Sequence, residues 1–429
     1  MSVAGTANAY TVAAPRISAE KLRLALLWLM GFSSALVFIE PSPYEFVAAA
    51  AMFVFALSGP ALRPTLAPFV LLLVVMNVGY GLGLVQVIAE PKAVTWVLIS
   101  AFLAATGIFY AAMLGTHTEA RLGWLLRGYL AAAVIASLAA IGGYFHLLGS
   151  WSDAFLIYDR ARATFNDPNV LGAFLVLPGL LAFQRVLEGR LTTVIGSGLL
   201  LLVMLAALLL TFSRAAWGQF AFSALLLMAM TFITSRSPRE RFRILLIAIA
   251  GVMVALGLFA ALLSIDKVAD LFKQRATLEQ SYDIGHYGRF GRYLLGAELA
   301  LDRPFGIGPL QFARFFWEDT HNSYLNSFMA GGWLSGFTYL TLAAVTVVAG
   351  LRFVFVATPW RATYLVVYAA YLGVAAESLV IDSDHWRHYF LILGALWGLM
   401  AVSRSYRPVA LQVQQFEALQ AWRRQPLRP

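Results

Sequence analysis

The sequence predicts an all-α membrane protein with about twelve transmembrane helices. Of its 429 residues, 60% are hydrophobic and only 12% are charged, and the mean hydropathy is +0.75. Soluble domains carry about 25% charged residues. The apolar residues also gather into long runs, and a helix that crosses a bilayer needs about 20 of them. The expected spans are 22–39, 44–58, 66–89, 93–114, 124–148, 170–184, 191–212, 217–234, 244–265, 324–349, 364–381 and 390–403.

The charge and the cysteine count exclude several other classes of protein. The chain has no Cys, which excludes a disulfide framework and a thiolate metal site. Its formal net charge of +9 is typical of a membrane protein with Lys and Arg in its cytoplasmic loops, so no nucleic-acid partner is expected. No P-loop and no Gly-x-Gly-x-x-Gly motif opens a helix, so nucleotide-driven chemistry is not expected.

Basic residues predict the direction in which the helices cross the membrane. They precede the first span and recur in alternate loops, which places those loops and both termini in the cytoplasm. The first nine helices then fall within residues 1–265, helices 10 to 12 within 324–403, and a cytoplasmic tail within 404–429. The basic residues are Arg16, Lys21, Arg23, Arg63, Arg121, Arg127, Arg185, Arg190, Arg236, Arg239, Arg241, Arg243, Arg352 and Arg361, with Arg404, Arg407, Arg423, Arg424 and Arg428 in the tail.

The segment 266–323 is expected on the side opposite the cytoplasm, as a small helical subdomain before the tenth helix. Within it, residues 290–301 predict an amphipathic helix, and Pro304 and Gly306 follow as helix breakers. Such a helix is expected to lie along the membrane surface with its apolar side in the interface.

Arginines on the side opposite the cytoplasm are candidate phosphate ligands. Arg214 directly follows a very apolar run, where a guanidinium is costly unless it snorkels, pairs or binds an anion. Arg289 and Arg292 lie in the 266–323 segment. A planar guanidinium can hold a phosphate through two hydrogen bonds, whereas contact with lipid headgroups is the alternative. Arg162 is a further substrate-binding candidate, for which pairing with nearby aspartates is the alternative.

His321 is the candidate acid–base residue, because an imidazole titrates near neutral pH. A hydrogen-bonding or capping role at the start of the next helix is the alternative. Asn322 is expected either to orient the imidazole or bind a sugar hydroxyl, or to cap that helix. Glycines further along the same helix are expected to allow close helix packing. They are Gly331, Gly332 and Gly336.

A polar and aromatic cluster spans residues 382–389, between the last two expected helices. The residues expected to bind substrate are Asp384, His385 and Arg387. Trp386 and Tyr389 are expected to offer stacking surfaces to a sugar, with a structural aromatic belt as the alternative. The spacing matches no metal motif, so no metal is expected. Glu377, inside a span, is expected to be functional or to pair with an arginine.

Four motifs follow one another between about residues 160 and 400. They are 162–169 (RATFNDPN), 212–214 (FSR), 288–308 (from Gly-Arg to Pro-Phe-Gly-Ile-Gly) and 321–325 (HNSYL). In this order they resemble the bacterial O-antigen ligase and O-antigen polymerase superfamily. The resemblance implies a polytopic glycosyltransferase of the bacterial inner membrane, with its active site facing the periplasm. It also implies that Arg214 and Arg289 contact the diphosphate of the donor, with Arg292 as the alternative to Arg289, and that His321 is catalytic.

The same resemblance implies the substrates. The donor is a glycan linked to undecaprenyl diphosphate, and neither a cofactor, a nucleotide sugar nor a metal ion is needed. A ligase transfers the glycan to lipid A–core, whereas a polymerase of O-antigen or exopolysaccharide transfers it to another lipid-linked repeat unit. We favour the ligase type. A transporter of lipid-linked saccharides is the alternative from another class, and it is less favoured because the sequence has no visible internal repeat.

Overall fold

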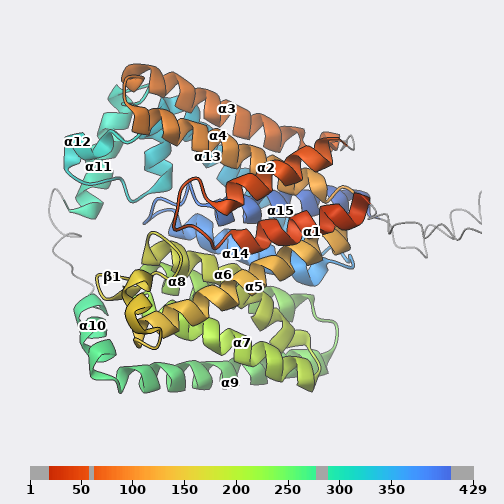
Figure 1. Cartoon of the computed structure of the whole chain (residues 1–429). Helices are drawn as coiled ribbons and strands as arrows, with labels where there is room; N and C mark the ends of the chain where they lie inside the picture. Colours follow the sequence, from red (N-terminus) through yellow and green to blue (C-terminus); the bar gives the residue numbers. More distant parts are fainter. Residues whose placement is uncertain (1–18, 58–61, 277–287, 407–429) are drawn as a thin grey trace, which may run out of the picture.

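The computed structural model describes residues 19–57, 62–276 and 288–406, and these form a bundle of helices (Figure 1). Expectations for the N-terminal residues, for part of the 266–323 segment and for most of the tail lie outside the described residues. The helices are α1 (Ala19–Ser33), α2 (Pro43–Ala56), α3 (Ala67–Leu84), α4 (Pro91–Met113), α5 (Thr118–Tyr144), α6 (Pro168–Glu188), α7 (Leu191–Leu210), α8 (Arg214–Thr234), α9 (Pro238–Leu263), α10 (Asp266–Ala276), α11 (Arg289–Asp302), α12 (Phe312–Phe316), α13 (Ser323–Phe353), α14 (Arg361–Glu377) and α15 (Arg387–Ser405). The strands β1 (Leu156–Ile157) and β2 (Arg160–Ala161) pair antiparallel.

Each range expected from hydropathy coincides with a helix, from α1 to α9 and from α13 to α15. Within the described residues, eight helices are long and apolar enough to cross a membrane. These findings confirm an all-α membrane protein, and the full number of twelve spans stays a prediction. The eight are Pro64–Val87, Pro91–Met113, Thr118–Tyr144, Pro168–Glu188, Leu191–Leu210, Arg214–Thr234, Pro238–Leu263 and Ser323–Phe353.

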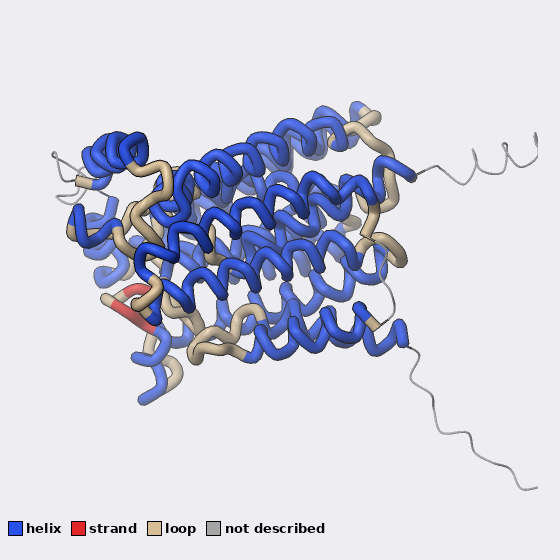
Figure 2. Tube along the Cα trace, turned by 90° about the horizontal axis from the view of Figure 1, so that it is seen from above, coloured by secondary structure: helices blue, strands red, loops and turns tan. Residues whose placement is uncertain are grey.

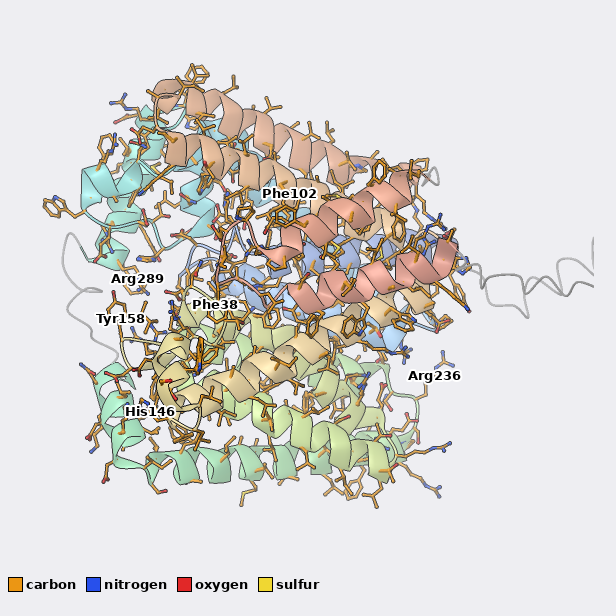
Figure 3. All side chains as sticks on the ribbon, in the orientation of Figure 1. Phe38, Phe102, His146, Tyr158, Arg236 and Arg289 are labelled. Atoms are coloured by element: carbon orange, nitrogen blue, oxygen red, sulfur yellow. The ribbon has the colours of Figure 1, made fainter. Side chains whose placement is uncertain are left out.

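The long helices run side by side, so the connections gather at two ends of the bundle (Figure 2). One end holds α10, α11 and α12 and is called the α11 end here; Arg289 and Tyr158 lie there (Figure 3). Arg236 lies at the opposite end, called the Arg236 end (Figure 3). An ion pair joins two helices there: Arg121 near the start of α5 pairs with Glu20 near the start of α1 at 2.8 Å.

Small residues bring the helices of the bundle close together, as they do in membrane proteins generally. A Cβ atom added at Gly128 of α5 would clash with the carbonyl of Trp28 in α1. Gly172 of α6 lies equally close to Ala216 of α8, since an added Cβ would be 2.5 Å from the Ala216 Cβ. The second contact brings the start of α6 against the start of α8.

Helix α13 is broken near its start, where Gly331 and Gly332 have non-helical backbone angles. Gly332 has φ 66°, a left-handed conformation that glycine adopts without steric cost. The loop after α11 enters this break: the amide of Trp333 donates to the carbonyl of Pro304 at 2.9 Å. The expectation of helix packing alone was therefore incomplete, because the two glycines bend the chain so that a loop of the α11 end can dock.

Candidate functional site

The carboxylate of Asp382 holds the backbone that leads into α13. It accepts hydrogen bonds from the Thr320 hydroxyl at 2.7 Å, the His321 amide at 3.0 Å and the Asn322 amide at 2.9 Å. Burial and the nearby Asp384 raise the pKa of Asp382 to about 7, although the hydrogen bonds favour its charged form. Sequence reasoning left Asp382 out of the candidate site residues, because nothing in the sequence links it to a turn 60 residues earlier.

His321 sits at the centre of this turn, with φ 47° in the left-handed region. Its carbonyl accepts a hydrogen bond from the Tyr293 hydroxyl at 2.8 Å, which ties the turn to α11. Burial, and then the charge of Arg289, lower the pKa of His321 below its ordinary value. The imidazole is therefore largely neutral at pH 7 and able to accept a proton.

The charges of both candidate arginines of α11 help to lower the pKa of His321. Arg292 is 3% exposed and forms an ion pair with Glu318, with 2.5 Å between Nη2 and Oε2. Arg289 is half-buried at the start of the helix. Of the two, Arg292 is engaged as an internal ion pair, whereas Arg289 has the more accessible position.

Arg214 is the first residue of α8, and the hydroxyl of the preceding Ser213 caps the helix by accepting from the Ala216 amide at 3.3 Å. The neighbouring loop is attached by Arg160, which donates to the Thr211 carbonyl at 2.7 Å and to the Asn169 side chain at 2.8 Å. The structure thus brings the motif at 162–169 next to the motif at 212–214.

Arg162 contacts its own loop, and its expected role in substrate binding stays a prediction. Its guanidinium donates to the carbonyl of Ala154, within its own loop, at 3.2 Å. The neighbouring Arg160 makes the contacts that join this loop to the start of α8. The sequence did not single out Arg160, because its partners, the Thr211 carbonyl and the Asn169 side chain, follow from the fold.

A buried polar group lies where α8 packs against α14. Gly373 contacts Gln219 and Ser223 so closely that an added Cβ would clash with the Ser223 hydroxyl. One turn further along α14, the side chain of Glu377 is 4% exposed. Among the described residues, neither carboxylate oxygen of Glu377 has a hydrogen-bond partner.

The end of α14 lies next to both the helix start that carries Arg214 and the turn that carries His321. Gln219, near the start of α8, lies against Gly373 near the end of α14, so Arg214 is at the same end of the bundle as the end of α14. Just beyond α14, the carbonyl of Ser378 accepts from the Ser323 amide at 2.9 Å. Arg214 and His321 therefore flank one helix end, at the α11 end of the molecule.

The polar residues after α14 are engaged mainly with protein groups. Asp384 accepts from the Asn326 side chain at 3.0 Å and lies 3.3 Å from Nδ1 of His385. Arg387 pairs with Glu45 of α2 at 2.6 Å. Tyr389 is 2% exposed, so it packs in the core and offers no stacking surface, contrary to expectation.

Asn322 caps α13. Its side-chain oxygen accepts from the Leu325 amide at 3.0 Å, and its amide nitrogen donates to the carbonyl of Leu379 at 3.1 Å. Of the two expectations for Asn322, the structure contains the capping interaction. Sequence reasoning could not separate them, because both place Asn at the same position.

One comparison with known proteins finds a family match over part of the chain. Residues 199–340 match the family model described as O-antigen ligase. The match begins in α7, ends in α13 and contains Arg214, Arg289, Arg292 and His321. A comparison with curated proteins finds no match for the chain. This part of the chain is thus similar to O-antigen ligases, and the match supports the resemblance to the O-antigen ligase superfamily that the sequence motifs carry.

Proposed function

We propose that this protein is an inner-membrane glycosyltransferase that moves a glycan en bloc from undecaprenyl diphosphate to a sugar hydroxyl. The proposed acceptor is lipid A–core, which makes the protein an O-antigen ligase. The observation that carries the proposal is the environment of His321. Its backbone amide donates to the Asp382 carboxylate at 3.0 Å. Burial, and then the charge of Arg289, lower the pKa of its imidazole and so favour the neutral form. A neutral imidazole beside two arginines suits a general base that faces an anionic leaving group.

In the proposed reaction, His321 takes the proton from the acceptor hydroxyl as its oxygen bonds to the anomeric carbon. The bond from that carbon to the diphosphate oxygen breaks, and undecaprenyl diphosphate leaves with the electron pair. Arg214 and Arg289 hold the diphosphate and stabilise the charge that develops on it, so no metal ion is required. Displacement in one step inverts the configuration at the anomeric carbon.

An apolar crevice beside Arg214 supports a donor with a polyprenyl chain. It has a volume of about 420 Å³ and lies between α7, α8 and α9, with Ala221, Leu225 and Met228 of α8 in its wall. Trp217, also in the wall, follows Arg214 by three residues, about 4.5 Å along the helix axis. A guanidinium one turn from an apolar crevice matches a ligand that joins a diphosphate to a hydrocarbon chain.

The charge distribution supports a periplasmic site. Arg289 lies at the α11 end and Arg236 at the opposite end (Figure 3). The loops around Arg236 are rich in arginine, and such loops remain in the cytoplasm. The α11 end, with His321, would then face the periplasm.

The acceptor separates the ligase from its alternative, a polymerase whose acceptor is another carrier-linked repeat unit. The test uses the purified full-length protein in nanodiscs with EDTA, a glycan on undecaprenyl diphosphate, and each acceptor in turn. We expect release of undecaprenyl diphosphate and a glycan on lipid A–core. A product on the carrier-linked acceptor alone would identify a polymerase, and no release with either acceptor would contradict both.

The matched variants for this test are Arg214→Ala and Arg236→Ala, at opposite ends of the bundle. Arg214→Ala removes a proposed diphosphate ligand, so we expect release to fall by at least about tenfold. Arg236→Ala should behave like the parent protein. Equal effects of the two substitutions would contradict the assignment of Arg214.

A further inference from the structure

A further pocket lies at the Arg236 end of the bundle, away from Arg214 and His321. It is lined by the last two turns of α6, the first halves of α5 and α14, and the start of α7. Arg361, which begins α14, donates to the carbonyl of Thr234 at the end of α8 at 3.5 Å, and Arg236 follows two residues later (Figure 3). Neither the proposed reaction nor the apolar crevice uses this pocket.

Two arginines line the pocket, Arg127 on α5 and Arg185 on α6, and both are exposed. The described residues place no carboxylate within ion-pair distance of either guanidinium. At the same end, by contrast, Arg121 is paired with Glu20 at 2.8 Å. The two guanidiniums in the pocket can therefore bind an anionic ligand without breaking an ion pair of the protein.

One carboxylate, that of Glu188, also lines the pocket. The charges of Arg361 and Arg243 attract it. Arg243 is held nearby, because it donates to the carbonyl of Leu187, the residue before Glu188, at 2.5 Å. With Glu188 compensated in this way, the two arginines of the wall leave the pocket with a positive charge, which favours an anion.

The inner part of the pocket is apolar. Leu130 follows Arg127 on α5, and Leu181 precedes Arg185 on α6. Since α5 begins and α6 ends at the Arg236 end, each leucine lies about one turn deeper in the bundle than its arginine. A ligand with an anionic group at this end and hydrocarbon toward the middle of the bilayer matches both parts.

The size of the pocket suits the polar part of a lipid. Its volume is about 340 Å³, equal to about eleven water molecules, and a glycerophosphate group has about ten non-hydrogen atoms. Gly123 of α5 adds to the room, because a Cβ atom placed there would meet no other atom within 4 Å. The pocket thus accepts a headgroup and leaves the ends of the acyl chains in the bilayer.

Trp124 indicates the depth of the two arginines in the membrane. It is 39% exposed, and the guanidinium of Arg127 lies over its ring at 5.7 Å from the centroid. Tryptophan is enriched at the boundary between the hydrocarbon and the headgroups of a bilayer. Arg127 is therefore expected at the depth of the lipid phosphates of one leaflet.

We infer that this pocket binds an anionic phospholipid, with its headgroup between Arg127 and Arg185 and the start of an acyl chain against Leu130 and Leu181. Basic pockets between transmembrane helices bind lipid headgroups in this way. In the proposed orientation the lipid comes from the cytoplasmic leaflet. It contacts α5, α6 and α14 at once, so its binding stabilises the folded bundle. The inference is separate from the glycosyl transfer, which takes place at the other end.

Native mass spectrometry of the purified, delipidated full-length protein tests the inference without any donor. The protein is titrated with phosphatidylglycerol, with zwitterionic phosphatidylethanolamine as the comparison and inorganic phosphate as the competing free anion. We expect the Kd for phosphatidylglycerol to be at least about tenfold lower than for phosphatidylethanolamine. Inorganic phosphate lacks the acyl chains and should not displace the lipid. Phosphatidylglycerol should also raise the melting temperature.

Two double variants test the role of charge. Arg127→Gln combined with Arg185→Gln removes both guanidiniums from the pocket and should abolish the preference for phosphatidylglycerol. Arg236→Gln combined with Arg239→Gln removes the same charge at the same end, from exposed arginines that line no part of the pocket. This control should keep the preference.

A matched pair of glycine substitutions tests the place of binding without changing any charge. Gly123→Phe fills the pocket and should weaken phosphatidylglycerol binding about tenfold. Gly196→Phe is the control, because an added Cβ there also meets no atom within 4 Å but lies outside the pocket. Phenylalanine suits a helix better than glycine does, so both variants should fold.

Equal affinities for the two lipids would overturn the inference, as would equal losses in the two double variants. Displacement of phosphatidylglycerol by inorganic phosphate would identify a site for a free anion instead of a lipid. Parental binding in Gly123→Phe would show that the lipid binds outside the pocket, which also contradicts the inference.

Discussion

The carboxylate of Asp382 and the backbone amide of His321 are 3.0 Å apart, although 61 residues separate them in the chain. Thr320 and Asn322 bind the same carboxylate. A left-handed turn in front of a helix is thereby fixed by a single acidic side chain from the neighbouring loop. The backbone that carries the imidazole is thus held by Asp382 as well as by Tyr293 of α11.

Asp382→Asn should therefore reduce glycan transfer while the protein stays folded. An amide offers one acceptor oxygen in place of two and turns a donor toward a backbone N–H, so the turn loses about 2 kcal/mol of support. The expected loss in kcat is about 30-fold, measured as release of undecaprenyl diphosphate. Asp153→Asn, at a residue whose side chain is 87% exposed, is the control. Parent-like turnover of Asp382→Asn would show that the turn keeps its shape without the carboxylate.

The pH dependence follows from the lowered pKa of His321. The Asp382 carboxylate, with a pKa of about 7, must be charged to hold the turn, and a base must be neutral to accept a proton. We therefore expect kcat/KM to begin to fall below about pH 7 and to fall further as the pH drops through the lowered pKa of His321. Arg289→Gln removes a charge that opposes the imidazolium and should raise this pKa. The direct measurement is an NMR titration of ¹⁵N-labelled histidine. Arg303→Gln, an exposed arginine of the same segment, should leave the titration unchanged; an equal shift in both variants would refute the assigned cause.

The apolar crevice predicts a dependence on the length of the donor chain. Ala221→Trp fills part of the crevice, and losing about 60 Å² of apolar contact would cost about 1.5 kcal/mol. We expect the KM for an undecaprenyl donor to rise about tenfold, and the KM for a short-chain donor to change little. Phe222→Trp, at the exposed neighbour outside the crevice, is the control. Equal effects on both donors would place the polyprenyl chain elsewhere.

The break in α13 predicts opposite outcomes for two glycine substitutions. Gly332 has φ 66°, and a Cβ there would clash with the Pro304 carbonyl, so Gly332→Ala should lower the melting temperature and the transfer activity. Gly196 lies within α7 with open space around its Cα, and Gly196→Ala should be neutral or stabilise by up to about 1 kcal/mol. Thermal unfolding of the two variants decides this point. A stable, active Gly332→Ala would show that the loop does not depend on the break.

The sequence predicted the helices well because hydropathy over a bilayer-spanning length is a local property. The amphipathic helix at 290–301 coincides with α11 for the same reason. The break in α13 could not be foreseen, because Gly331 and Gly332 also suit tight packing. The loop that carries Pro304 decides between a break and tight packing, because it packs against Gly332 from outside the helix.

The site was predictable in its residue types and less so in its contacts. His321 and the arginines stood out because polar groups next to apolar spans are costly. Their partners are distant in sequence: Arg387 pairs with Glu45 in α2, and no local pattern shows this. The sequence also gave no sign that Nε2 of His388 is buried without a hydrogen-bond partner among the described residues. The packing of α15 decides whether that side chain is buried.

The central claim is that His321 is the base of a glycosyl transfer whose donor is held by separate residues. The most direct measurement follows the new glycosidic bond in a single turnover by the purified His321→Ala variant, with donor binding measured on the same sample. The account predicts that the variant binds undecaprenyl-diphosphate glycan as the parent does and forms no product. Product formed at the parental rate by this variant would contradict it.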